Sequence, residues 1–132
     1  MTIVNSAQRV FPGFGTLSNY TTAQNVALSG ATTTTAVTVG TQGYTCGQVR
    51  VKVYGGGSST TTATISVTVT DGTNTYLIGS IPAYAIGNGA NSGVDVTFFV
   101  DVDIQIATVN IITALTVGTT TATLDYEVML NP

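Results

Sequence analysis

Apolar and polar side chains alternate from residue 94 to residue 106, and this is the most regular pattern in the chain. Successive side chains of a β-strand point to opposite faces of a sheet, so the pattern gives one face for a core and one for water. A helix would distribute the same apolar residues around its whole circumference. The pattern therefore predicts a strand, or a strand that continues through a bend into a second one. The apolar phase comprises Val94, Val96, Phe98, Val100, Val102, Ile104 and Ile106, and Phe99 is the single apolar residue in the other phase.

The same alternation recurs in shorter segments, with turn residues between them. Residues 71–74, Asp-Gly-Thr-Asn, are a strong hairpin signal because these residue types tolerate the positive φ of tight turns. Between Ile106 and Val109 the apolar phase shifts by one position without a Gly or Pro, which predicts a bulge or a corner between two sheets. The other predicted strands are residues 26–28, 35–39, 49–53, 65–69, 76–81, 109–117 and 122–130.

These elements predict an all-β fold, an antiparallel β-sandwich of about eight strands that is jelly-roll-like or immunoglobulin-like. Every charge inside a predicted strand lies in the polar phase, as a sandwich with one buried face per sheet requires. The chain has no Trp and no Cys pair, which favours the jelly roll over the immunoglobulin form. The expected core comprises Val49, Val51, Val53, Ile65, Val67, Val69, Val96, Phe98, Val100, Leu124, Tyr126 and Val128.

Residues 1–24 lack sustained alternation, and Pro and Gly interrupt any regular element there. We interpret this segment as an extended N-terminal arm, and residues 25–132 as the sandwich domain. The alternative is a poorly ordered tail, which is common at chain termini. Aromatic anchors often dominate interfaces, and the arm combines them with a single charge that could pair with an acidic partner. The arm residues expected to bind a partner are Arg9, Phe11, Phe14, Leu17 and Tyr20.

A second candidate contact is the predicted loop at residues 82–92, which separates two predicted strands. Loops of this length in a compact domain are often functional. Tyr84 and Ile86 are large side chains of this loop, and we expect them to contribute to partner binding.

Charged residues make up only 7% of the chain, far below the ~25% of ordinary domains, and 27 threonines take their place. Three basic residues cannot neutralise a phosphate backbone or bind an anionic membrane, so we expect no nucleic-acid partner and no membrane partner. No apolar run approaches the ~20 residues of a spanning helix. The first residues do not resemble a secretory signal, which predicts synthesis in the cytoplasm.

The residue types exclude several chemistries. With no His and one Cys, the chain cannot build Ser-His or Cys-His dyads or His metal sites. Asp101 and Asp103 share one strand face, where a carboxylate pair could serve a glycosidase or bind calcium, but a solvated acidic stripe is the favoured interpretation. Cys46 is expected to be a partly buried filler. We therefore expect no enzymatic activity, no cofactor and no metal.

A binding or structural role remains, and one resemblance bears on it. An N-terminal arm followed by a Thr- and Gly-rich, charge-poor sandwich with Val-Thr-Val-Thr-Asp-Gly-Thr-Asn-Thr-Tyr at residues 67–76 resembles the small capsid cement or decoration proteins of tailed bacteriophages. The resemblance implies a structural virion protein on the capsid surface. It also implies a trimer or dimer that binds the major capsid protein and bridges neighbouring subunits.

The alternative function is a carbohydrate-binding or tail-adhesin β-sandwich module. Four aromatic residues could provide a sugar-stacking platform for it, although such residues more often pack on a sheet surface or at an interface. These residues are Tyr54, Tyr76, Tyr84 and Phe99.

Overall fold

The computed structural model describes residues 10–11, 15–16, 19–29, 32–39, 44–57, 60–87, 92–116 and 121–131. These residues form ten strands, and none of them forms a helix long and apolar enough to cross a membrane. Two short strands, β1 and β2, pair only with each other in the described part of the chain. The strands are β1 (Val10–Phe11), β2 (Gly15–Thr16), β3 (Asn19–Ser29), β4 (Thr32–Thr38), β5 (Tyr44–Tyr54), β6 (Thr62–Thr70), β7 (Thr75–Ala85), β8 (Gly93–Ile106), β9 (Thr108–Thr116) and β10 (Thr121–Asn131).

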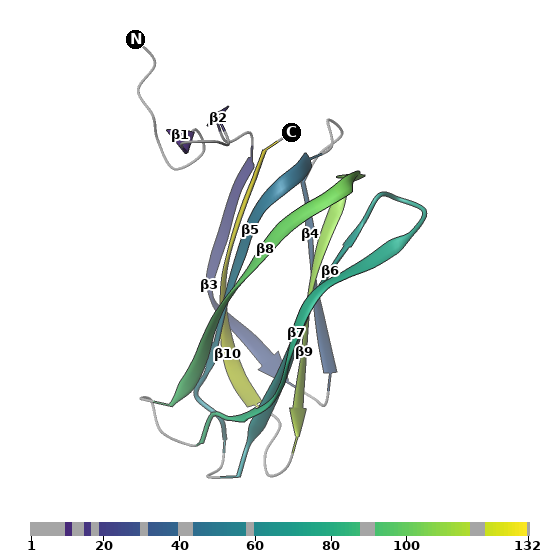
Figure 1. Ribbon diagram of the computed structural model, residues 1–132. Coiled ribbons are helices and arrows are strands. Elements are labelled where there is room, and N and C mark those ends of the chain that lie inside the picture. The colour runs from purple at the N-terminus through teal and green to yellow at the C-terminus, as the bar shows by residue number, and fades with distance from the viewer. Residues whose placement is uncertain are drawn as a thin grey trace.

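The eight longer strands form two antiparallel sheets of four strands each (Figure 1). The strand order is β3-β10-β5-β8 in the first sheet and β4-β9-β6-β7 in the second. The two sheets face each other (Figure 1). Buried side chains from both sheets form one hydrophobic core. The prediction of an all-β, sandwich-like fold is therefore confirmed at this level.

The strand pairs are nested around the turn at residues 71–74. The central pair is β6 with β7, and outside it β5 pairs with β8, β4 with β9, and β3 with β10. The chain is therefore folded like one long hairpin, in which the strands before residues 71–74 pair antiparallel with the strands after them. Two further pairings, β10 with β5 and β9 with β6, join the nested pairs into the two sheets.

The core follows the alternation of the sequence. In β6 the side chains of Ala63, Ile65, Val67 and Val69 are fully buried, whereas the threonines and the serine between them are half-buried. Ten of the twelve predicted core residues are buried, and the other two, Val96 and Tyr126, are half-buried against the core. Thr113 interrupts the apolar phase of β9 and is also buried, and its hydroxyl donates a hydrogen bond to the Thr33 carbonyl at 3.4 Å.

Both turn predictions are confirmed. At residues 71–74 the Asp71 N–H donates to the Asn74 carbonyl at 3.2 Å, and Gly72 has a φ of 99° that favours glycine. The phase shift after Ile106 is a corner between the sheets, because β8 belongs to one sheet and β9 to the other. Ala107 holds this corner by donating to the Thr70 carbonyl at 2.8 Å and accepting from the Val39 N–H at 3.1 Å.

Two predicted boundaries need correction. Strand β3 begins at Asn19, so residues 19–24, which we assigned to the arm, belong to the first sheet. Strand β7 continues through Pro82 to Ala85, so the first third of the predicted loop at residues 82–92 is strand. Proline is tolerated here because β7 is an edge strand, paired with β6 alone in the part of the chain that the structure describes, and the missing N–H removes no bond from the centre of the sheet.

Candidate functional site

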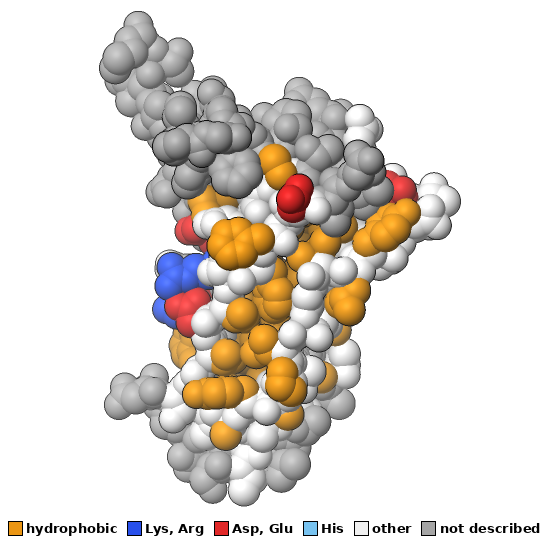
Figure 2. All heavy atoms as spheres, in the orientation of Figure 1, with side chains coloured by type: hydrophobic (Ala, Val, Ile, Leu, Met, Phe, Trp, Pro, Cys, Tyr) orange, Lys and Arg blue, Asp and Glu red, His pale blue; other side chains and the backbone are white. Residues whose placement is uncertain are grey.

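Most of the few charges of the chain gather on the outer face of the β3-β10-β5-β8 sheet. The register places Lys52 beside Asp95 of β8 on one side and beside Asp125 of β10 on the other. Arg50 has the same relation to Glu127 of β10. Figure 2 shows this cluster as adjoining blue and red side chains at one margin of the molecule. We call Arg50, Lys52, Asp95, Asp125 and Glu127 the charged face.

Arg50 and Asp95 form a bidentate ion pair across β5 and β8. The Arg50 Nε donates to Asp95 Oδ1 at 3.0 Å, and Arg50 Nη2 donates to Asp95 Oδ2 at 2.6 Å. The hydrogen bond from Arg50 lowers the pKa of Asp95, and the same bond raises the pKa of Arg50. Both side chains are about half exposed, so solvent screens the pair and it positions the strands more than it stabilises them.

Asn25 lies at a β-bulge beside this face. The register between β3 and β10 shifts between Leu124 and Tyr126, and Asn25 has a φ of 59°. Asp125 Oδ1 accepts a hydrogen bond from the Asn25 N–H at 2.8 Å and from the Tyr54 hydroxyl at 3.1 Å. The Tyr54 hydroxyl also lies 3.3 Å from Asn25 Oδ1. Desolvation, followed by this bond to Asp125, raises the pKa of Tyr54.

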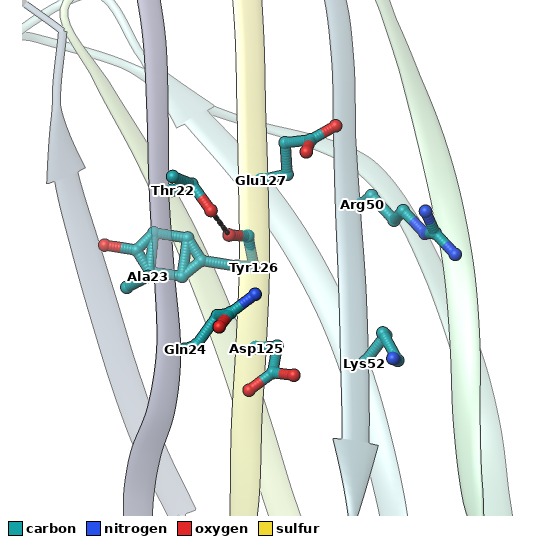
Figure 3. Close-up of a pocket in the computed structure, with 8 residues that line it drawn as sticks. All are labelled: Thr22, Ala23, Gln24, Arg50, Lys52, Asp125, Tyr126 and Glu127. Carbon is teal, nitrogen blue, oxygen red and sulfur yellow. Dashed lines mark hydrogen bonds between the residues drawn. The ribbon is translucent and has the colours of Figure 1, made fainter. Parts of the chain in front are cut away.

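The bulge opens a hollow of about 160 Å³ on the charged face (Figure 3). In Figure 3, Gln24, Asp125 and Lys52 project from three adjacent strands at one level, and Thr22 donates to the Tyr126 carbonyl at 3.1 Å. The residues that line the hollow are Thr22, Ala23, Gln24, Arg50, Lys52, Asp125, Tyr126 and Glu127. A second hollow adjoins the first through Lys52 and Asp125 and reaches Tyr54, Ser92 and Asp95.

This arrangement suits polar recognition. It presents carboxylate and amide acceptors, an ammonium group and hydroxyls, which can hydrogen-bond a polar ligand or a protein surface. Among the described residues, no three His, Cys, Asp or Glu side chains are placed to hold a metal ion. The sequence pattern placed the charges on this face correctly, but it did not reveal the Tyr54–Asn25–Asp125 cluster, because the bulge contains no Gly.

Most of the arm residues named from the sequence lie outside the residues that the structure describes. Arg9, Phe14 and Leu17 lie outside the described residues. Phe11 is in β1 and Tyr20 is in β3, where Tyr20 is opposite Met129 of β10, and only their backbone is described. Partner binding by the arm therefore stays a prediction.

Tyr84 and Ile86, the two residues named from the loop, are placed differently from each other. Tyr84 is 54% exposed near the end of β7, where it is available to a partner. Ile86 is fully buried in the core, and its N–H donates to the Thr61 carbonyl at 3.0 Å. The expectation that Ile86 contacts a partner is therefore wrong for this fold, because its side chain seals the core behind the end of β7.

The four aromatic residues of the suggested sugar platform do not form one surface. Tyr54 is half-buried and tied to Asp125, whereas Phe99 on β8 is opposite Gln48, six residues along β5 from Tyr54. That separation is about 20 Å at ~3.3 Å per residue. Tyr76 and Tyr84 lie on β7 in the other sheet.

Two other sequence-derived candidates have modest structural roles. Asp101 is exposed on β8, whereas the side chain of Asp103 lies outside the description. Cys46 is half-buried in β5, in agreement with its interpretation as a partly buried filler.

Comparison of the chain with protein-family models, with curated proteins and with solved structures finds no match.

Proposed function

We propose that this chain is a structural protein of a virus particle, a cement or decoration protein that binds the outside of a bacteriophage shell. In this role it bridges neighbouring subunits of the major capsid protein and stabilises the shell, acts as a homo-oligomer and catalyses no reaction. It is made in the host cytoplasm and resides on the capsid surface.

The nested pairing of the strands is the observation that carries the proposal. Four antiparallel pairs folded around residues 71–74, with the orders β3-β10-β5-β8 and β4-β9-β6-β7, support assignment of the fold as an eight-stranded jelly roll. Jelly rolls are frequent among viral capsid and lectin domains. The Thr-rich strand faces add hydrogen-bonding surface without the desolvation cost of buried charges, which suits close contact with a shell.

Binding to a shell tests the proposal directly. The purified chain is mixed with capsids assembled from the major capsid protein encoded beside its gene, and the mixture is sedimented. We expect the chain to sediment with the capsids at a fixed ratio and to raise the temperature at which they break. A chain that stays in the supernatant at saturating concentration, or a gene neighbourhood without capsid genes, contradicts the proposal.

A truncated chain without residues 1–18 tests whether the arm makes the contact with the shell. It keeps β3, which begins at Asn19, so loss of sedimentation reports loss of contact rather than loss of folding. Full occupancy by the truncated chain would assign the contact to the sandwich, with the exposed Tyr84 as the first residue to substitute.

A carbohydrate-binding or tail-adhesin module is the second candidate, and the hollow in Figure 3 favours it. Clustered carboxylate, amide and ammonium groups are the donors and acceptors that fix the orientation of a polar ligand such as a sugar. Glycan-array binding that is lost in Asp125→Asn and retained in Thr34→Ala, a change on an exposed position of the other sheet, would support this function instead.

A further inference from the structure

Strands β7 and β8 leave one side of the sandwich open. Each is the edge strand of its sheet, and among the described strands each pairs with a single neighbour, β7 with β6 and β8 with β5. Both strands run along the face that Figure 1 turns to the viewer. They touch where the Phe98 ring lies over Gly79, because a Cβ added to Gly79 would lie 2.7 Å from the Phe98 Cδ1 atom.

This open side is the most apolar surface in the described part of the chain. All four large hydrophobic side chains that are exposed there lie on these two strands: Tyr76 at 39%, Leu77 at 66%, Tyr84 at 54% and Phe99 at 71%. Between them, Ile78, Ile81, Val94 and Val96 are only partly buried against the core. Figure 2 shows hydrophobic side chains extending along this face. We call these eight residues the β7–β8 strip.

The size of the strip matches a protein partner rather than a small molecule. Strand β7 has 11 residues and so extends about 36 Å at ~3.3 Å per residue. Two strands from sheets ~10 Å apart, with their own widths added, make a strip about 20 Å wide. The resulting area is on the order of 700 Å², close to the ~800 Å² that each partner contributes to a stable interface.

The charge distribution points to a second copy of the same chain. Identical copies bring identical charges to their contact, and like charges directly opposite each other are unfavourable. Strand β7, with the sequence TYLIGSIPAYA, carries no charge at all. The described charges near the strip are Asp95 and Asp101 on β8 and Asp71 in the turn before β7. Asp95 is already paired with Arg50. A contact centred on β7 would therefore have an apolar middle and a polar rim, as interfaces between proteins do.

The backbone of β7 favours side-chain packing over a continuous sheet between copies. Its pairing with β6 has two register shifts, and Pro82 lacks an N–H to donate. Irregular edges and edge prolines disfavour long intermolecular ladders. We propose that two copies of this chain associate by packing their β7–β8 strips against each other. Tyr76 and Tyr84 lie opposite the buried Val69 and Ala63 of β6 and therefore face the contact. Leu77 and Phe99 lie opposite Thr68 and Gln48, on the outer faces of the two sheets, and form the margins of the contact. This association is independent of shell binding, because it involves the isolated protein alone.

Sedimentation of the isolated chain tests this association. At ~100 µM, above the micromolar Kd range of modest complexes, we expect the wild-type chain to sediment with more than the monomer mass of 13.5 kDa. Tyr84→Lys should weaken association at least ~30-fold, as expected for an aromatic anchor of an interface. Phe99→Lys should weaken it less.

The matched control is Thr34→Lys, which places the same charge on an exposed position of β4, the opposite edge strand of the sheet that contains β7. It should associate as the wild type does. All three positions are exposed, so thermal unfolding should show that each variant remains folded. A wild-type chain that is monomeric at this concentration, or an oligomer that Tyr84→Lys leaves intact, overturns the proposal.

Discussion

At the scale of single residues, the polar side chains of this chain mainly fix backbone geometry. Asn25 is the only non-glycine residue with a positive φ in the described part of the chain, and the Asp125 carboxylate binds its N–H at the bulge. Asp71 has a similar role in the turn, where its Oδ1 accepts from the N–H groups of Thr73 at 2.8 Å and Asn74 at 2.7 Å. A few carboxylates therefore shape the backbone at the ends and irregularities of strands.

These carboxylates should make the fold sensitive to acid. Backbone hydrogen bonds from Asn74 and Thr73 lower the pKa of Asp71 below its ordinary value of 3.8, and Arg50 lowers that of Asp95. Because both pKa values are lower in the folded chain, the resulting stability is present above pH 3.8 and is lost as the pH falls through the folded values. We expect the melting temperature to decrease when the pH is lowered below about 4.

The variant Asp71→Asn isolates the contribution of the turn. Its amide oxygen can still accept the backbone hydrogen bonds, but it no longer ionises in this range. Its melting temperature should therefore depend less steeply on pH between 4 and 2 than that of the wild type, within the window set by the ordinary carboxyl pKa of ~3.9. An identical pH dependence in the two proteins would contradict the assignment.

At the scale of elements, the sequence predicts strands well where buried and exposed side chains alternate along the strand. Among the described side chains of β5, β6, β8 and β10, the period of two matches the observed burial because these strands cover the core, with Met129 of β10 as a buried exception in the polar phase. The edges are harder to predict. No side chain of β7 is fully buried, and the strand contains Pro82, so its second half resembles a loop in the sequence. Ile86, just beyond β7, is buried through contacts with segments distant in sequence, which periodicity cannot reveal.

The adjacent residues Phe98 and Phe99 test the assignment of the two faces of β8. Phe98 is 8% exposed and packs against Gly79 of the opposite sheet, whereas Phe99 is 71% exposed. Phe98→Ala should lower the free energy of unfolding by about 3–5 kcal/mol because it leaves a cavity in the core. Phe99→Ala should change it by less than ~0.5 kcal/mol, as is usual for exposed positions. Denaturant unfolding at low protein concentration measures both, and comparable costs would mean that the faces are assigned incorrectly.

At the scale of the whole molecule, the nested strand order explains why local sequence patterns predict where the strands lie but not which strands pair. Within the two four-stranded sheets, only β6 and β7 are both joined by a short turn and paired with each other, and every other pair joins strands distant in sequence. Strand β3 at the beginning of the sandwich pairs with β10 at its end. The charged face depends on this closure, since Asn25 and Asp125 meet only when the two strands pair.

The same closure defines where the sandwich begins and can be tested by two truncations. The register of β3 with β10 starts at Asn19 opposite Leu130, and β1 and β2 pair only with each other among the described strands. Deletion of residues 1–18 should therefore leave the unfolding free energy nearly unchanged. Deletion of residues 1–24 removes the paired positions from Asn19 to Ala23 and exposes the outer edge of β10, so it should lower the unfolding midpoint clearly.

Denaturant unfolding followed by far-ultraviolet circular dichroism compares the two truncated chains with the full chain. The shorter deletion is the control for the longer one, because both lack the N-terminal segment and they differ only in half of one strand. Equal midpoints for the two truncations would mean that the first half of β3 contributes nothing to the sheet, and the boundary at residue 25 expected from the sequence would then stand. A midpoint that falls only in the longer deletion places the beginning of the folded unit at Asn19, with the pairing of β3 and β10 as its closing step.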